Sequence, residues 1–84
     1  MNLSQLKEQL ILLKVLPEEY SLDGDLKSYA IVLYKNYEKW EVFYLDERGS
    51  RNDFQIFRSE ADACNYIYNH FEAKTLRRKK YGIS

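Results

Sequence analysis

Three runs of β-branched and aromatic residues occupy the middle of this 84-residue chain and constrain its fold more than any other feature. They cover residues 29–35, 40–45 and 52–57, and such runs are typical of β-strands. The polar breaks between them, 36–39 and 46–51, are too short for a parallel return, which needs a crossover of about a dozen residues or more. The sequence therefore predicts a three-stranded antiparallel meander.

Helical patterns flank the three predicted strands. Leucines at positions 3, 6, 10 and 13 have the spacing of one helix face, so we expect a helix from Ser4, as its N-cap, to about residue 15, where Pro17 stops it. Ser59 and Asp62 form a near capping box for a second helix, which runs from about residue 60 to 73 or beyond. Its expected buried stripe consists of Ala63, Cys64, Ile67, Tyr68 and Phe71. The predicted fold is α+β, in the order α-β-β-β-α.

The sequence leaves open which side of the first strand faces the helices. One alternation class holds Tyr29, Ile31 and Leu33, and the other holds Ala30, Val32 and Tyr34. Both classes are apolar, and a one-residue change of register exchanges the two faces. Neither class is therefore assigned to the core.

Size and charge place the chain in a broad class. Residues 1–84 form one domain by length, and no run approaches the roughly 20 apolar residues of a membrane span. The start of the chain lacks the pattern of a signal peptide, so we expect a cytoplasmic protein. Residues 1–72 hold all 13 acidic side chains and only eight of the 13 basic ones, which leaves a basic tail at about 74–84. The positive charges of that tail either stabilise the negative C-terminal end of a helix dipole or bind an oppositely charged partner.

No set of residues forms a catalytic, cofactor or metal constellation. Cys64 and His70 lie six residues apart on one predicted helix, about 240° apart around its axis, so they do not form a dyad. One cysteine and one histidine do not make a zinc cluster, and the three glycines are too dispersed for a phosphate loop. The Asp-Gly-Asp triplet at 23–25 lacks the other ligands of a calcium loop and favours a plain turn. We expect no enzyme, no cofactor and no metal.

Tyrosine is enriched, with eight residues in the chain. Four of them lie in or beside the first predicted hairpin, together with a tryptophan: Tyr29, Tyr34, Tyr37, Tyr44 and Trp40. If helices cover one side of the sheet, aromatic residues on the other side would form a rigid contact surface of the kind enriched at protein interfaces. Alternatively, the tyrosines flank the core with their hydroxyl groups in water. The sequence does not decide between these two interpretations.

Several short phrases carry a family resemblance. They are Trp40-Glu41-Val42-Phe43-Tyr44, then Glu47-Arg48-Gly49 after two residues, then Phe57-x-Ser59 and Ala63-Cys64-x-Tyr66. Together they resemble small bacterial immunity proteins of polymorphic toxin systems of the contact-dependent inhibition type. The resemblance implies a cytoplasmic protein that binds and neutralises a cognate toxin without chemistry of its own. It also implies structural roles: packing for Trp40 and Cys64, a turn at Gly49, and pairing of Arg48 with an acid, with Ser59 opening the last helix.

Two functional hypotheses follow. The first is a toxin-binding module whose acidic and aromatic surface meets a basic nuclease. Its candidate contact residues are Asp23, Asp25, Glu41, Tyr44, Asp46 and Glu47. The second is a double-stranded RNA-binding domain, which has the same order of elements and would use the cations at 77–80 for phosphate contacts. Glu60 and Asp62 stand where such domains carry lysines, which argues against nucleic acid, and nothing predicts a membrane partner or an oligomeric state.

Overall fold

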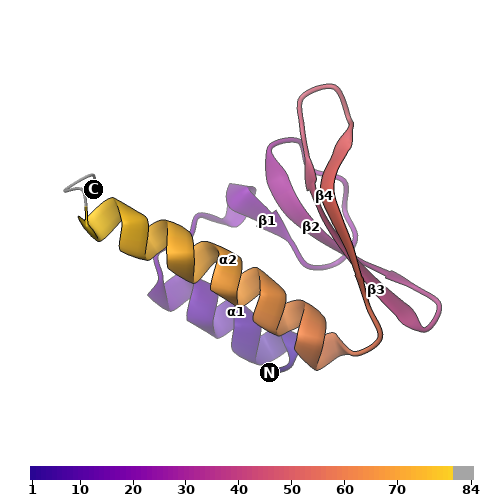
Figure 1. The fold of residues 1–84 in the computed structure, drawn as a ribbon, viewed down its shortest axis with the longest axis horizontal. Coiled ribbons are helices and arrows are strands. Elements are labelled where there is room, and N and C mark those ends of the chain that lie inside the picture. Colours follow the sequence, from indigo (N-terminus) through magenta and orange to yellow (C-terminus); the bar gives the residue numbers. More distant parts are fainter. Residues whose placement is uncertain (81–84) are drawn as a thin grey trace.

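The structure is a computed structural model that describes residues 1–80, with the side chains of residues 1–77. The basic side chains expected at 78–80 and residues 81–84 therefore lie outside the described part. The elements are α1 (Leu3–Leu12), a 3-10 turn η1 (Pro17–Glu19), β1 (Tyr20–Ser21), β2 (Ala30–Asn36), β3 (Lys39–Leu45), β4 (Arg51–Phe57) and α2 (Glu60–Lys80). The two helices lie side by side and cover one face of the sheet, which makes a two-layer domain (Figure 1).

The sheet has four strands in the order β1-β2-β3-β4. The antiparallel meander predicted from the sequence is confirmed as β2, β3 and β4, and the α+β class is confirmed with it. The prediction of a purely antiparallel three-stranded sheet is wrong, because β1 adds a parallel strand, with Tyr20 paired to Ile31 and Ser21 to Val32. A two-residue strand has no alternation that a sequence pattern could reveal.

The first helix begins and ends earlier than predicted. Its N-cap is Asn2 rather than Ser4: the Asn2 side chain accepts a hydrogen bond from the Gln5 backbone at 2.8 Å, and the Gln5 side chain accepts one from the Asn2 backbone at 3.0 Å. This reciprocal pair is a capping box, which satisfies two backbone donors that a helix start otherwise leaves open. Gln5 supplied the signal for it in the sequence.

A Schellman motif, and not Pro17, ends the first helix. Lys14 has a positive φ of 62°, its backbone N–H donates to Ile11 at 2.9 Å, and the Val15 N–H donates to Leu10 at 3.0 Å. These two bonds satisfy carbonyl groups that the helix end would leave without partners. Pro17 instead opens the 3-10 turn that leads into β1.

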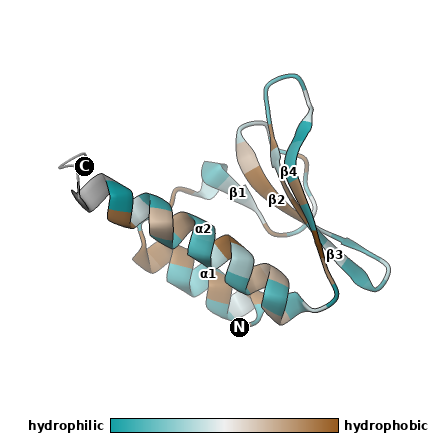
Figure 2. Cartoon of the chain, viewed as in Figure 1, coloured by the Kyte–Doolittle hydropathy of each residue, from teal (hydrophilic) through white to brown (hydrophobic). Residues whose placement is uncertain are grey.

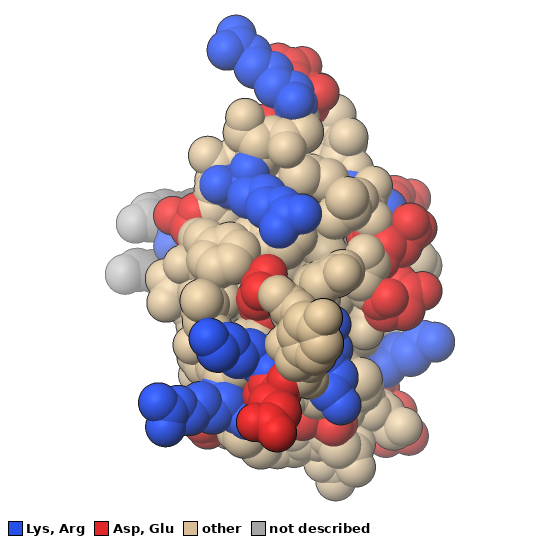
Figure 3. All heavy atoms as spheres, turned by 90° about the vertical axis from the view of Figure 1, so that its right-hand side faces the viewer, with Lys and Arg blue, Asp and Glu red and all other residues tan. Residues whose placement is uncertain are grey.

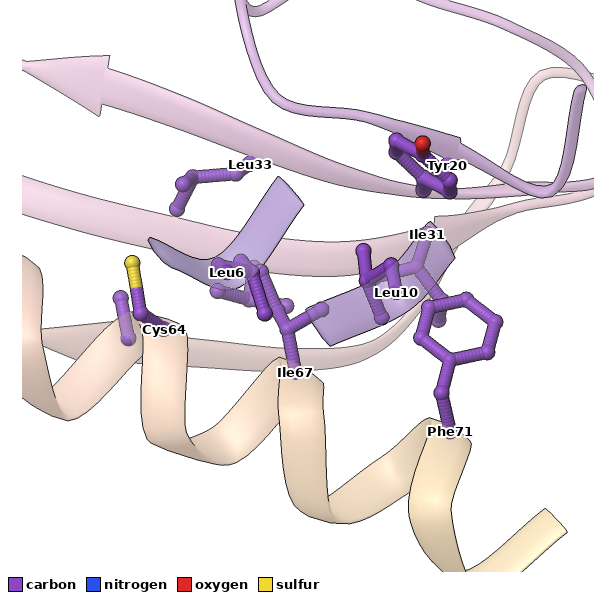
Figure 4. Close-up of a cluster of buried hydrophobic side chains, with 10 residues drawn as sticks. Leu6, Leu10, Tyr20, Ile31, Leu33, Cys64, Ile67 and Phe71 are labelled. Atoms are coloured by element: carbon purple, nitrogen blue, oxygen red, sulfur yellow. The ribbon is translucent and has the colours of Figure 1, made fainter. Parts of the chain in front are cut away.

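The main core lies between the two helices and one face of the sheet. Figure 4 shows side chains from α1, α2, β1 and β2 meeting there: Leu6, Leu10, Tyr20, Ile31, Leu33, Cys64, Ile67 and Phe71. The set containing Ile31 and Leu33 therefore faces the helices, which answers the question that the sequence left open. The hydrophobic stretches of the sheet lie along β2 and β3, while the connecting turns are hydrophilic (Figure 2).

The turn between β2 and β3 gives a first testable prediction. Asn36 pairs with Lys39, so the connection has two residues, and its first residue, Tyr37, has a φ of 59°. Glycine adopts such a φ without steric cost, so Tyr37→Gly is expected to raise the free energy of unfolding by about 0.5–1 kcal/mol in urea denaturation. Glu38→Gly, the matched control, is expected to give no gain because Glu38 does not have a positive φ. Equal effects of the two glycines would contradict this assignment.

Candidate interaction surface

The face of the sheet turned away from the helices, which we call the open face, carries a mixed apolar and aromatic surface. The strand register assigns to it Val32 and Tyr34 of β2, Glu41, Phe43 and Leu45 of β3, and Arg51, Phe54 and Ile56 of β4. Figure 3 views the molecule from this side: uncharged side chains cover much of it, Lys and Arg side chains are spread among them, and acidic side chains gather along the right-hand edge. No helix covers this face in the described part of the chain (Figure 1).

The open face has a buried inner layer. Val32, Phe43 and Leu45 form a second small core that is separate from the main one. Two side chains of β4 cover the Phe43 ring: the Phe54 ring stacks on it with centroids 5.9 Å apart, and the Arg51 guanidinium lies 4.7 Å from its centroid. The stacking and the cation–π contact keep these rings in fixed positions. The open face is therefore a prepacked surface rather than a set of loose side chains.

The outer layer of the open face exposes three large hydrophobic side chains. Tyr34 is 41%, Phe54 42% and Ile56 53% exposed. Tyr34 pairs with Glu41 across β2 and β3, and Glu41 pairs with Ile56 across β3 and β4, so these three residues form one row across the sheet. Directly paired side chains of this kind lie about 5 Å apart. The row therefore places a carboxylate between an aromatic and an aliphatic side chain.

Glu41 is the most unusual member of that row because its side chain is charged and only 8% exposed. The Asn36 side-chain amide donates a hydrogen bond to Glu41 Oε2 at 3.0 Å. It is the one hydrogen-bond donor to this carboxylate within the described residues, whereas an ionised carboxylate accepts up to about four. Glu41 thus retains the capacity to accept a charge-assisted hydrogen bond from a partner's Arg or Lys.

Asp23 and Asp25 lie exposed in the loop between β1 and β2. The Asp23 carboxylate accepts hydrogen bonds from the Ser21 hydroxyl at 3.0 Å and from the Asp25 backbone at 3.2 Å. Both bonds lower the pKa of Asp23, and the bond from the Asp25 N–H has the larger effect. The triplet forms a local turn, as the sequence favoured, with Gly24 at a φ of 84°. It adds fixed negative charge beside the sheet.

Asp46 and Glu47 have different roles in the turn between β3 and β4. The Asp46 carboxylate accepts hydrogen bonds from the backbones of Arg48 and Ser50, both at 2.9 Å, and from the Asn52 amide at 3.2 Å. These bonds lower the pKa of Asp46, and they give its carboxylate a structural role in the turn. Glu47 is exposed and accepts a hydrogen bond from the Tyr29 hydroxyl at 2.9 Å. It remains available at the end of the sheet.

Tyr44 does not share a surface with Glu41. It pairs with Ile31 on the helix-facing side and packs against the main core. There it lines a pocket of about 360 Å³ between the sheet and α2, together with Asp53, Tyr66, His70, Lys74 and Arg77. The predicted contact set is therefore split: Tyr44 lies on the side of the sheet opposite to Glu41, beneath α2.

A β-bulge shapes that pocket. The register of β3 and β4 shifts between Val42 and Tyr44, and Asp53 has a φ of 53° at this shift. The extra residue explains why the alternation along β4 breaks. β4 is also the edge strand of the sheet, and all but the last of its residues are exposed. Bulges of this kind re-aim side chains, and here Asp53 joins the helix residues that line the pocket.

The pocket gives a prediction about His70. Partial burial lowers the pKa of His70, and the charges of Lys74 and Arg77 lower it further, while Asp53 opposes them. An NMR titration is expected to place its pKa below the ordinary value of about 6.5. Lys74→Gln is expected to raise that pKa, whereas Lys39→Gln, on the distant hairpin, leaves it unchanged. A value at or above 6.5 in the native protein would contradict the assignment.

The sign of the linked stability change follows from that lowered pKa. The unfolded chain binds a proton at His70 more readily than the folded protein does. The contribution of His70 to stability is therefore fully present above the unfolded pKa. It is lost as the pH falls from that value through the folded pKa.

The motif residues behind the family resemblance occupy structural positions. Trp40 packs against the main core with Lys35 Nζ 5.1 Å from its ring centroid, and Cys64 is buried in that core, where burial raises the pKa of its thiol. The Ser59 hydroxyl accepts a hydrogen bond from the Asp62 backbone at 3.1 Å and caps α2. Arg48 is exposed and forms no ion pair with the described side chains, contrary to expectation.

Comparisons with known proteins provide no relative for this chain. No protein-family model, curated protein sequence or solved structure gave a significant match. Within residues 1–80, no helix combines the length and the hydrophobicity needed to cross a bilayer. Function is therefore inferred from the chemistry of the open face and its surroundings.

Proposed function

We propose that this protein is a non-catalytic binding module that binds and neutralises a cognate protein toxin, as immunity proteins do. The observation that carries the proposal is the row of Tyr34, Glu41 and Ile56 on the open face, with Phe54 beside it. Interface cores are rich in aromatic side chains and contain few charges, and the few buried charges there find partners across the interface. Glu41 has that character: it is nearly buried, held by Asn36, and able to accept further hydrogen bonds.

The charge around the open face supports a basic partner. Asp23 and Asp25 lie exposed in the loop beside β2, and Glu47 lies exposed at the end of β3. Acidic side chains at the rim of an interface accelerate association with a basic protein, and here they lie beside the exposed cations Arg48 and Arg51. A nuclease toxin with a basic substrate-binding surface fits this pattern. The association rate is then expected to fall as the salt concentration rises.

The dimensions of the sheet favour a contact that includes its rim. Strands of seven residues span about 23 Å, and three strands span roughly 15 Å across, giving about 350 Å² for the open face. A standard interface buries about 800 Å² on each partner. We therefore expect the contact to extend beyond the strands, over the loops that carry Asp23, Asp25 and Glu47.

Double-stranded RNA is the alternative ligand. The order of elements, and the packing of both helices on one face of the sheet, resemble those of a double-stranded RNA-binding domain. The start of α2, which such domains use for phosphate contacts, carries Glu60 and Asp62. Glu60 is also engaged, since its carboxylate accepts a hydrogen bond from the Leu3 backbone at 2.8 Å and links the two helices. Phosphates would meet carboxylates there, so we favour a protein partner.

Co-expression with the product of the neighbouring gene tests the proposal. We expect the neighbour to inhibit growth of a bacterial host and this protein to restore it, with recovery of a complex that weakens as salt rises. A neighbour without toxicity, together with no recovered partner, would contradict the proposal. A gel shift with duplex RNA at physiological salt is the second arm, and tight binding there would favour the alternative.

A further inference from the structure

A groove of about 760 Å³ lies between α1, η1 and the loop that follows β1. Its walls are mostly apolar and include Ile11, Val15, Leu16 and Leu22. Ile11 is 60% exposed, and Leu16 is exposed as well, so the groove presents apolar surface to water. None of its lining residues belongs to the open face. Concave, mainly apolar surface is typical of sites for small molecules.

The rim of the groove is cationic. Lys7, Lys14 and Lys27 line it, and Asp23 is the one acid among its lining residues. The Asp23 carboxylate already accepts hydrogen bonds from Ser21 and from the Asp25 backbone. Asp23 stays ionised and offsets one of the three lysine charges, and Lys27 is among the groups that lower its pKa. Three lysines against one aspartate leave the groove with a formal excess of positive charge.

The three lysines keep donors available for a ligand. Lys27 Nζ donates to the backbone carbonyl groups of Pro17 at 3.2 Å and Tyr20 at 3.5 Å, which leaves one of its three N–H bonds free to donate and fixes its position. Lys7 and Lys14 form no ion pair with any described side chain. An apolar trough with unpaired ammonium groups at its rim is complementary to a molecule that has an apolar body and an anionic head.

We propose that this groove, the α1–β1 groove, binds a free amphipathic carboxylate, that is, an acyl chain with an ionised head group. The chain would lie along Ile11, Val15 and Leu16, and the head group would meet the lysines. The volume falls within the roughly 300–1,000 Å³ of small-molecule sites, which are mainly apolar with a few placed polar groups.

Two other occupants fit the groove less well. A second copy of this chain, docked by two-fold symmetry, would bring the same lysines toward one another, because both partners use the same patch in such an interface. A flat membrane surface would reach the rim of the groove but not its concave wall. A free chain reaches both the wall and the lysines.

Titration of the 84-residue protein with sodium decanoate, below the concentration at which decanoate forms micelles, tests the proposal. We expect saturable binding at one site by calorimetry, with backbone amide NMR shifts confined to residues around the groove. Decanol is expected to bind more weakly, and decyltrimethylammonium is expected not to bind. Binding should weaken with salt because the lysine contacts are exposed to solvent.

Matched variants separate the groove from general hydrophobicity. Ile11→Gln is expected to lower the affinity for decanoate about tenfold through lost apolar contact, whereas Leu12→Gln at the next, 73% exposed position outside the groove lining is expected to leave it unchanged. The double variant Lys7→Gln and Lys14→Gln is expected to lower decanoate affinity about fivefold and to leave decanol binding unchanged. Lys39→Gln with Arg58→Gln is the charge-matched control.

Several results would overturn the proposal. They are the absence of saturable binding, equal effects of Ile11→Gln and Leu12→Gln, and equal binding of the cationic amphiphile. Binding to anionic vesicles without binding of monomeric decanoate would identify a membrane surface instead. Concentration-dependent dimer formation that Ile11→Gln abolishes, without decanoate binding, would identify a second copy as the occupant.

Discussion

Ile67→Ala is expected to lower the free energy of unfolding by about 2–5 kcal/mol. Ile67 is fully buried at the centre of the main core, and Figure 4 shows its side chain directed from α2 toward Leu6 and Leu10 of α1. Its truncation removes apolar contact and leaves a cavity where the two helices meet. Because a domain of 84 residues has a total stability of about 4–12 kcal/mol, this loss is a large part of the whole.

Urea denaturation followed by circular dichroism measures the effect, and two variants control it. Leu76→Ala changes an exposed leucine on the same helix and is expected to change stability by less than about 0.5 kcal/mol. Ile67→Val removes one methylene and is expected to cost about 0.5–1.5 kcal/mol. A similar cost for Ile67→Ala and Leu76→Ala would show that α2 does not pack through this side.

The fold was predictable where a pattern extends over several residues. Strands β2 to β4 follow from apolar runs of about six residues with short breaks, and α2 follows from a stripe that begins after Ser59. Strand β1 was not predictable, because its two residues pair with β2 only after the chain has folded around the loop at 22–29. The end of α1 depends on a lysine with positive φ, a conformation that is usual for glycine and that leaves no signal in a lysine.

The candidate contact residues lie on two faces of the sheet, and strand geometry explains this division. Glu41 and Tyr44 are three residues apart in one strand, and side chains an odd number of residues apart point to opposite faces. This spacing was visible in the sequence and already excluded a common surface for the two residues. Phe54 and Ile56 were missed for another reason: the bulge at Asp53 breaks the alternation of β4, and no local pattern predicts a bulge there.

The groove was also absent from the sequence prediction. The Leu-rich α1 was expected to bury its apolar residues in the core, as Leu6 and Leu10 do. Ile11 follows Leu10 directly and therefore lies about 100° around the helix from it, on the side that lines the groove. The other wall comes from residues 15–22, whose position depends on β1. A site built between a helix and a strand that the sequence does not reveal has no signature of its own.

The double variant Tyr34→Ala with Ile56→Ala is expected to lower affinity for the proposed toxin partner about 100-fold or more. Both side chains flank Glu41 on the open face and are about half exposed, so a partner would bury them, and central interface residues of this kind each contribute about 1–4 kcal/mol. The fold should survive, because neither residue belongs to a buried core cluster. Growth rescue should be lost together with the complex. Calorimetry with the partner recovered by co-expression measures the change.

A second double variant controls for the general loss of exposed hydrophobic surface. Leu12→Ala with Leu76→Ala removes two exposed apolar side chains from the helices, outside the open face, and is expected to leave affinity unchanged. Comparable losses in both double variants would show that binding depends on general surface hydrophobicity. Full affinity in the Tyr34 and Ile56 variant would place the contact elsewhere on the molecule, while the toxin would remain its partner. Glu41→Gln is a further test of whether the partner contacts the open face. It reduces affinity only if a cationic side chain of the partner reaches the centre of that face.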